Sequence, residues 1–361
     1  MEKLLGRFGE MVHKDFWHKR KVFITGHTGF KGSWLTLWLA SLGADIVGYS
    51  LDPPSSPYLF KQANVEKACH SLQGSITDYS SLLQAMNSAQ PEIVFHLAAQ
   101  PLVHTSYKQP LSTFDTNVMG TANILEAAKN VTSIRVIINV TSDKCYENDG
   151  LGGYSFQESD RLGGYDPYSA SKACAELIAT SYQKSFFQDS TLRLASVRAG
   201  NVIGGGDWAE GRLIPNLMRC YINSEKLYLR NPHAIRPWQH VLEPLQGYML
   251  VAEKLWEDEN YSGAWNFGPI NQPSITVEKI VEMTMNLWEK ELEVIYPTSS
   301  SFYESLILTL DSTKAQEKLG WTPKLSTEES LAWTVEWYQR CIAGEDLSTF
   351  TYHQINSFIT K

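Results

Sequence analysis

Near its beginning the chain reads Val22-Phe-Ile-Thr-Gly-His-Thr-Gly-Phe-Lys-Gly-Ser-Trp-Leu35, and this stretch decides the fold. The apolar and β-branched residues from Val22 to Thr25 predict a buried strand, and glycines follow at positions 26, 29 and 32. Apolar residues then recur at helical spacing up to Gly43. In such a strand, turn and helix, the glycines allow a tight turn, a close approach of pyrophosphate and contact between helix and strand. The helix N–H groups face the phosphates. The stretch therefore favours a dinucleotide site over an ordinary turn.

The rest of the chain extends this pattern into a doubly wound α/β fold. Further apolar runs alternate with helical patterns and predict a parallel Rossmann sheet. After a glycine-rich loop that begins at Asn201 the alternation gives way to short elements, which we interpret as a smaller C-terminal substrate-binding lobe. We therefore expect an N-terminal extension (1–19), an NAD-binding Rossmann domain (20–200) and a nucleotide-sugar-binding lobe (201–361), with some lobe segments returning to the sheet.

Composition limits the possible partners. The 361 residues carry a net charge of −8 and contain no basic run, which argues against a nucleic-acid partner. The five cysteines show no spacing typical of a metal site, and their odd number suits a reducing cytoplasm. We find neither a signal peptide nor a run of about 20 apolar residues. These features predict a cytoplasmic protein with no metal and no membrane partner.

Two acidic residues are candidates to contact the adenosine half of a dinucleotide. Asp52 lies twenty residues after Gly32, where an acidic side chain would meet the ribose hydroxyls, and Ser50 is a rival for this contact. No Lys or Arg occurs between positions 47 and 60 to hold a 2′-phosphate, which favours NAD over NADP. Asp78 precedes a helical pattern, so it is either an N-cap or a partner of the adenine amine.

The candidate catalytic residues lie at the end of one strand and the start of one helix. The strand that ends at Val140 is followed by Thr141-Ser142-Asp143-Lys144, and the carboxyl edge of a parallel sheet is where ligands bind. Tyr168 and Lys172 are four residues apart and share a helix face. A lysine ammonium beside the phenol lowers the pKa of Tyr168 from about 10 towards neutrality. The phenolate can then take a proton from a sugar hydroxyl while hydride leaves the same carbon for nicotinamide, with Ser142 bonded to the same oxygen.

Other polar residues are candidates for holding the site or its substrate. Asn117 has a poor propensity for the helix interior in which it lies. It is either a surface residue or a side chain whose amide holds a neighbouring loop. Four arginines of the lobe could clamp a diphosphate: Arg212, Arg219, Arg230 and Arg236.

Four motifs together resemble the nucleotide-sugar dehydratases and epimerases of the extended short-chain dehydrogenase/reductase family. The motifs are Thr25-Gly-His-Thr-Gly-Phe-Lys-Gly-Ser-Trp34, His96-Leu-Ala-Ala-Gln100, Thr141-Ser-Asp-Lys-Cys-Tyr146 and Tyr168-Ser-Ala-Ser-Lys172. The resemblance covers roughly Phe16 to Gly344, and within the family it is strongest to the dehydratases that act on CDP-glucose. It implies bound NAD, a nucleotide-sugar substrate (CDP-glucose), and a homodimer or dimer of dimers built on the helices near 110–131 and 167–187.

The resemblance also implies roles for residues of this chain. The expected catalytic residues are Ser142, Asp143, Lys144, Tyr168 and Lys172. The expected NAD contacts are Gly26, His27, Thr28, Gly29, Phe30, Lys31, Gly32, Ser50, Asp52, Asp78, Leu97, Ala98, Ala99, Thr141, Tyr168 and Lys172. The expected substrate contacts are Gln100, His104, Asn117, Arg198, Asn201, Arg212, Arg219 and Arg236.

The implied reaction is a 4,6-dehydration that yields a deoxysugar precursor of surface polysaccharide. Hydride leaves C4, water is lost across C5 and C6, and hydride returns to C6. Asp143 would protonate the departing C6 hydroxyl. Lys144 stands where sister enzymes usually have a glutamate base, so the group that removes the C5 proton stays open between Lys144 and Tyr168. Alternatives are an epimerase, a dehydratase for another nucleotide sugar, or a non-catalytic scaffold that binds NAD.

Two residues of the glycine-rich turn depart from related turns. His27 stands where glycine is common and Lys31 where an apolar residue is common. We expect the His27 imidazole to crowd the pyrophosphate and loosen NAD, and His27→Gly to tighten it.

Overall fold

In the computed structural model a seven-stranded parallel sheet forms the centre of the molecule, in the order β11-β7-β5-β4-β1-β2-β3. The structure describes residues 12–53, 56–148, 154–270, 275–297 and 307–361. The strands are β1 (Lys21–Thr25), β2 (Asp45–Ser50), β3 (His70–Gln73), β4 (Ile93–His96), β5 (Val136–Val140), β7 (Arg193–Ala199) and β11 (Gly263–Phe267). Chain order reverses between β1 and β4, which is where ligands bind in open sheets of this kind. The predicted doubly wound Rossmann fold is confirmed.

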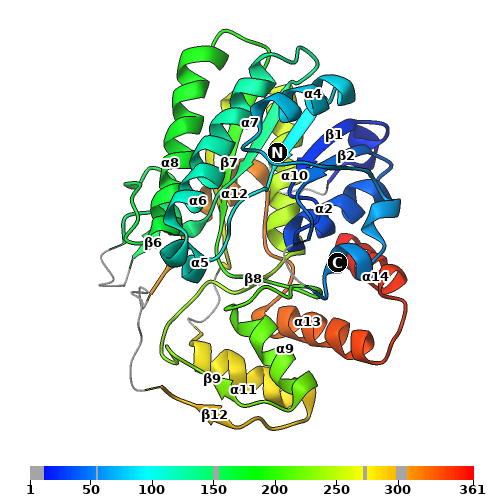
Figure 1. Cartoon of the computed structure of the whole chain (residues 1–361), viewed down its shortest axis with the longest axis vertical. Coiled ribbons are helices and arrows are strands. Elements are labelled where there is room, and N and C mark those ends of the chain that lie inside the picture. Colours follow the sequence, from blue (N-terminus) through cyan, green and yellow to red (C-terminus); the bar gives the residue numbers. More distant parts are fainter. Residues whose placement is uncertain (1–11, 54–55, 149–153, 271–274, 298–306) are drawn as a thin grey trace, which may run out of the picture.

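Helices cover both faces of this sheet (Figure 1). One layer contains α4 (Tyr79–Ala89), α6 (Pro110–Phe114), α7 (Gly120–Lys129) and α8 (Pro167–Tyr182), which contact one another. The other contains α2 (Phe30–Ser41), α10 (Leu242–Glu257), α12 (Thr313–Leu319) and α14 (Leu347–Thr360). A π-helical turn, Asp115–Met119, joins α6 to α7. The helix expected from 110 to 131 is therefore continuous from 110 to 129 but is interrupted by this π-helical turn. No helix of the described residues is long and apolar enough to cross a membrane.

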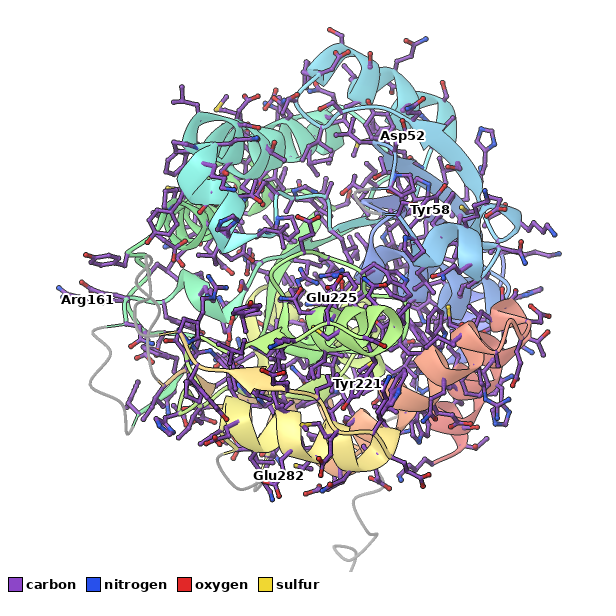
Figure 2. The ribbon with its side chains drawn as sticks, turned by 60° about the horizontal axis from the view of Figure 1, so that its bottom comes forward. Asp52, Tyr58, Arg161, Tyr221, Glu225 and Glu282 are labelled. Atoms are coloured by element: carbon purple, nitrogen blue, oxygen red, sulfur yellow. The ribbon has the colours of Figure 1, made fainter. Side chains whose placement is uncertain are left out.

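The smaller elements form the lobe and the connections. In the lobe are β8 (Val202–Ile203), α9 (Leu213–Asn223), β9 (Leu227–Tyr228), β10 (Gln239–His240), α11 (Val277–Trp288), β12 (Val294–Ile295) and α13 (Thr327–Ile342). Elsewhere lie α1 (Lys14–Trp17), α3 (Leu59–Gln62), η1 (Val65–Lys67), α5 (Val103–Lys108), η3 (Asp143–Cys145), β6 (Ser155–Phe156), η4 (Gln183–Phe187), η5 (Glu259–Tyr261) and β13 (Thr309–Leu310). Figure 2 shows Tyr221 of α9 and Glu282 of α11 on the lobe, with Asp52 and Tyr58 farther away on the sheet domain.

Residues beyond position 200 also build the core of the sheet domain. Strand β11 pairs with β7, and α10 packs on β5 and β7. Almost every residue of α10 is buried, including Glu243. The sequence pattern did not single out α10, in which polar residues such as Glu243 and Glu253 are buried rather than gathered on a solvent face. The hydrophobic core of the sheet domain therefore continues past residue 200. The predicted division at that residue concerns only which part binds NAD and which part binds the substrate, and it stays a prediction.

Candidate functional site

A cavity of about 600 Å³ lies across the carboxyl ends of β1, β4 and β5 and extends under the lobe. The glycine-rich turn forms one end of it. Gly26 has a positive φ of 76°, and a Cβ there would lie 2.7 Å from the Ala98 nitrogen. A Cβ on Gly32 would lie 2.1 Å from the Gly26 carbonyl oxygen. Glycine is therefore required at both positions, one for the turn and one for the approach of helix to turn.

Most of the expected NAD contacts line this cavity. They are Gly26, Thr28, Gly29, Phe30, Lys31, Gly32, Ser50, Asp52, Leu97, Ala98, Ala99, Thr141, Tyr168 and Lys172. The hydroxyls of Thr28 and Ser50 form a hydrogen bond with 2.8 Å between their oxygens, and this bond joins the turn to the end of β2. Both Ser50 and Asp52 line the cavity, so the choice between them as the ribose contact stays open.

His27 does not lie at the cavity, and the expectation that its imidazole crowds the pyrophosphate is wrong. The ring is fully buried, its Nε2 is 2.7 Å from Oγ of Ser71, and it packs edge-on against Phe60. A Cβ on Gly48 would lie 2.3 Å from the ring. The side chain thus fills the space that Gly48 leaves in β2 and points away from the ligand face. Burial lowers the pKa of His27 to about 4, so the ring is neutral.

Asp78 is an N-cap rather than a residue that lines the cavity. Its Oδ1 accepts a hydrogen bond from the Ser81 backbone N–H at 3.1 Å, and its Oδ2 accepts one from the Ser81 hydroxyl at 2.6 Å. Both carboxylate oxygens are therefore used to begin α4, which decides between the two alternatives in favour of the cap.

Ser142 and Asp143 stand where β5 ends and the short helix η3 begins. The Ser142 hydroxyl donates to Oδ1 of Asp143 at 3.0 Å and accepts a bond from the Lys144 backbone N–H at 3.3 Å. Asp143 is 3% exposed, and its Oδ2 has no hydrogen-bond partner among the described residues. Burial raises the pKa of Asp143, although Lys144, the Ser142 hydroxyl, Arg236 and Lys31 oppose the change. A carboxyl group in these surroundings retains its proton to a higher pH than an exposed one.

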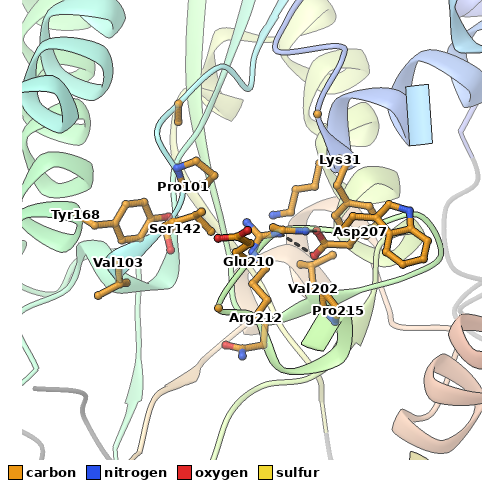
Figure 3. Close-up of a pocket in the computed structure, with 18 of the residues that line it drawn as sticks. Lys31, Pro101, Val103, Ser142, Tyr168, Val202, Asp207, Glu210, Arg212 and Pro215 are labelled. Atoms are coloured by element: carbon orange, nitrogen blue, oxygen red, sulfur yellow. Dashed lines mark hydrogen bonds and ion pairs between the residues drawn. The ribbon is translucent and has the colours of Figure 1, made fainter. Parts of the chain in front are cut away.

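Tyr168 and Lys172 lie in the first two turns of α8, facing the cavity. Asp166 caps the helix through the Ser169 N–H at 3.0 Å, and Pro167 occupies its first turn. The Ser142 hydroxyl lies close to the Tyr168 phenol and acts to lower its pKa. Figure 3 shows Tyr168 and Ser142 side by side.

The pKa of Tyr168 differs from the expectation. Burial raises the pKa of Tyr168 to about 12, against a lowering by the Ser142 hydrogen bond. The Lys172 ammonium instead donates to the Val140 carbonyl at 3.3 Å. Burial lowers the pKa of Lys172 to about 8, while Glu176 acts in the opposite direction. The expected lowering of the Tyr168 pKa is therefore wrong here, because desolvation of the phenolate outweighs the nearby positive charges.

Asn117 holds a neighbouring loop, as one of the two alternatives predicted. Its Oδ1 accepts from the Gln100 N–H at 2.8 Å, and its Nδ2 donates to the Gln100 carbonyl at 3.0 Å and to Oγ of Ser171 at 2.8 Å. The Gln100 amide is also occupied, by Thr113 Oγ1 and the Leu102 N–H. Neither Asn117 nor Gln100 lines the cavity, so the structure places them as supports rather than substrate contacts.

The arginines expected to bind substrate divide into two kinds. Arg212 and Arg236 line the cavity, as do Arg230, His104 and Asn201. Arg198 does not: it points into the protein and pairs with Glu176. Arg219 does not either, since it holds the loop before α9 through the Trp208 and Ala209 carbonyls at 2.8 and 3.2 Å. Arg198 and Arg219 are thus structural residues that do not line the cavity, and sequence position alone did not reveal their partners.

The structure adds residues that the sequence did not single out. Asp207 is buried and accepts a hydrogen bond from Arg212 at 2.9 Å, with Lys31 nearby (Figure 3). Glu210 and Tyr228 also line the cavity. Burial and the neighbouring Arg212 charge lower the pKa of Lys31 to about 7. The sequence pattern did not identify Asp207 as a site residue, because its ion pair with Arg212 forms only when the loop between them folds.

That loop is fixed from behind by one helix near the start of the chain, α2, and one near its end, α13. Trp34 of α2 donates to the Gly205 carbonyl at 3.0 Å, and a Cβ on Gly205 would lie 1.9 Å from the ring of Trp337 in α13. Tyr338 donates to the Asp207 carbonyl. The segment that holds Arg212 over the cavity is therefore packed between α2 and α13.

Comparison with known proteins identifies the family of this chain. The family model described as GDP-mannose 4,6 dehydratase matches residues 23–334. The chain belongs to the GDP-mannose 4,6-dehydratase family. Among curated members it is 46% identical to the CDP-glucose 4,6-dehydratase of Salmonella typhimurium, over 97% of this chain and 99% of that protein. It is 26% identical to the dTDP-glucose 4,6-dehydratase of Haemophilus influenzae, over 88% of this chain and 97% of that protein.

Solved structures share the fold of this family. The UDP-glucose 4-epimerase of Thermotoga maritima, solved with UDP-glucose, has a TM-score of 0.78 and 23% identity, covering 89% of this chain and 99% of its own. The dTDP-glucose 4,6-dehydratase DesIV of Streptomyces venezuelae, solved with NAD, has a TM-score of 0.76 and 22% identity, covering 90% and 98%. The expected resemblance to nucleotide-sugar dehydratases and epimerases is confirmed.

Proposed function

We propose that this chain is a CDP-glucose 4,6-dehydratase that works with resident NAD. The observation that carries the proposal is the meeting of Ser142, Asp143, Tyr168 and Lys172 in the same cavity as the glycine-rich turn. Identity of 46% to a CDP-glucose 4,6-dehydratase over nearly the full length supports the choice of nucleotide. The product would be a 4-keto-6-deoxy sugar nucleotide, a precursor for deoxysugars of surface polysaccharide.

The residues of the turn fit NAD. Gly29, Phe30 and Lys31 at the N-terminus of α2 line the cavity, so the free N–H groups of this first turn would face the pyrophosphate. Asp52 lies at the cavity with no Lys or Arg between positions 47 and 60, which suits a ribose with a free 2′-hydroxyl. When bound, NAD would supply the hydride acceptor for C4 and the hydride donor for C6.

Each proposed catalytic residue has a stated task. Tyr168, beside the Ser142 hydroxyl, removes the proton of the C4 hydroxyl as hydride leaves that carbon. Asp143 gives its proton to the C6 hydroxyl, which departs as water. Loss of the C5 proton, made acidic by the C4 ketone, completes the elimination. The acceptor is either Lys144 or Tyr168, which must first release the C4 proton to solvent. Arg212 and Arg236 hold the diphosphate.

The same proposal includes the assembly and compartment of the protein. Four apolar side chains on the α6–α8 layer are at least half exposed: Leu111 (83%), Met119 (52%), Leu177 (58%) and Phe186 (50%). Large exposed apolar side chains gathered on one layer favour a homodimer through these helices. The five cysteines are all free thiols, which supports a reducing cytoplasm.

One experiment tests the activity and the substrate together. The purified protein is incubated with NAD and, separately, with CDP-glucose, dTDP-glucose, UDP-glucose and GDP-mannose, and each mixture is analysed by mass spectrometry and nicotinamide absorbance. We expect loss of one water from CDP-glucose with no net NADH. Water loss from another sugar would overturn the choice of nucleotide. Epimerisation without water loss, or no turnover of any sugar, would overturn dehydration itself.

A further inference from the structure

A buried ion pair lies behind the proposed catalytic residues. Arg198 of β7 donates from Nε and Nη2 to the two carboxylate oxygens of Glu176 in α8, both at 2.8 Å. Each side chain is 3% exposed. Burying an ion pair is costly, and apolar residues of the same volume often serve stability equally well. The pair therefore points to a purpose other than stability.

Glu176 touches both elements that carry the site. It lies on α8 four residues after Lys172 and eight after Tyr168, so the three side chains lie along one side of the helix. Its Oε1 also accepts a hydrogen bond from Oγ1 of Thr141 at 2.5 Å. Thr141 directly precedes Ser142. One carboxylate thus joins the helix of the Tyr-Lys pair to the strand end that delivers Ser142.

Arg198 fixes the same strand end from the far side. Its Nη1 donates to the Tyr146 hydroxyl at 2.7 Å, and that hydroxyl donates to Oδ1 of Asn266 in β11 at 2.7 Å. Tyr146 follows η3, the helical turn that contains Asp143. The chain between Thr141 and Tyr146 is therefore held at both ends by one buried network.

The charge of Glu176 also reaches Lys172. Burial lowers the pKa of Lys172 to about 8, and the nearby Glu176 carboxylate is the main opposing influence. Other titratable groups that face Lys172 are the Cys145 thiol, the neutral His96 imidazole of β4 and the Lys31 amine of α2. Those that face Tyr168 are Asp143, Asp166, Arg212 and Tyr248. Without Glu176, Lys172 would lose its proton at a lower pH, and the helix face that carries Tyr168 would lose the ammonium charge of Lys172.

We propose that Glu176 and Arg198 are positioning residues for the oxidation step. Glu176 sets the strand end that carries Ser142 against the helix that carries Tyr168 and supplies the negative charge that faces the Lys172 ammonium. Arg198 holds the Glu176 carboxylate in place. This assignment rests on the proposed function, since it concerns the proton that Tyr168 removes from a sugar hydroxyl.

The test is the pH dependence of the oxidation step in Glu176→Gln and in the double variant Glu176→Leu with Arg198→Met. The double variant removes both charges, so no unpaired charge is left buried and we expect it to fold. NADH formation from CDP-glucose in a single turnover is followed by absorbance at a series of pH values. In a plot of the oxidation rate against pH, we expect the rising limb of both variants to move about one pH unit higher. The oxidation rate would then be roughly tenfold lower near neutrality and would return to the wild-type value at alkaline pH. Glu176→Asp, which keeps the charge, should shift the limb less.

A matched control is Glu253→Gln, which changes another buried carboxylate. Glu253 accepts a hydrogen bond from Trp17 Nε1 at 2.6 Å at the far end of α10, so its variant should leave the limb in place. A folded double variant whose profile superimposes on that of the wild type overturns the inference, as does a rate that falls equally at every pH. A wild type that oxidises a different sugar overturns only the proposed substrate, and the shift is then measured on that sugar. If the wild-type protein oxidises no nucleotide sugar, both the proposed function and this inference are overturned.

Discussion

The hydroxyl of Ser142 donates to Oδ1 of Asp143 at 3.0 Å, while Oδ2 of the same carboxyl makes no hydrogen bond to any described residue. The two oxygens of Asp143 therefore differ. One is fixed by Ser142, the residue beside the Tyr168 phenol, and the other is left to carry a proton. The proposed acid for the C6 hydroxyl is thus held by the residue that also lies beside the proposed base for the C4 hydroxyl.

Asp143→Asn should separate the two halves of the reaction. The amide keeps the size of the side chain but cannot supply an acid proton, so we expect C4 oxidation to continue while water loss falls by about 10²–10⁴. NADH absorbance would rise and persist, and mass spectrometry would show no dehydrated product. Dehydration of CDP-glucose at the wild-type rate would show that Asp143 is not the acid.

Tyr168→Phe should stop the oxidation itself. Only the hydroxyl is removed, so CDP-glucose should still bind within a few fold, but NADH formation should fall by about 10²–10⁴. Because burial raises the pKa of Tyr168 to about 12, its basic form grows as pH rises, and the wild-type oxidation rate should increase from neutral to alkaline pH. Single-turnover absorbance checks both statements. A variant that retains more than about a tenth of the wild-type rate would assign the base elsewhere.

The features that sequence could predict are those set by near neighbours. The turn from β1 to α2 and the pair Tyr168–Lys172 depend on spacing within a few residues, and both lie at the cavity. Arg198 could not be assigned in this way, because its partner Glu176 comes from another element and meets it only in the folded chain. His27 was misplaced for a similar reason, since the space for its ring exists only because β2 has a glycine at position 48.

Acid should destabilise the protein through its buried histidines. Burial lowers the pKa of His27 to about 4 and those of His96 and His240 to about 3, from 6.5. The unfolded chain therefore binds these protons first, so the stabilising effect is complete above pH 6.5 and is lost as pH falls towards 4. His240→Phe, which keeps a ring between Trp34 and Trp333, should lose less in melting temperature between about pH 7.5 and pH 5 than the wild type. An equal loss in both proteins would contradict this account.

Leu177→Arg should separate the proposed dimer. Leu177 is 58% exposed on α8, and an arginine there would be buried without a partner if two such layers packed together. Sedimentation should show half the wild-type mass. Tyr228→Arg is the control, because Tyr228 is 64% exposed on β9 in the lobe and should leave the mass unchanged. A wild type that sediments as a monomer, or a Leu177 variant of unchanged mass, would remove this interface.

The contact of Gly205 with Trp337 has a consequence for how the protein is made. More than a hundred residues separate the two positions, so at about 5–20 residues per second the ribosome adds Trp337 many seconds after Gly205. During that interval the strands β1 to β7 and Trp34 of α2 have been synthesised, whereas the support that α13 gives to the Gly205 loop has not. A nascent chain can therefore form its cofactor end first, and Arg212 gains its final position only when α13 emerges.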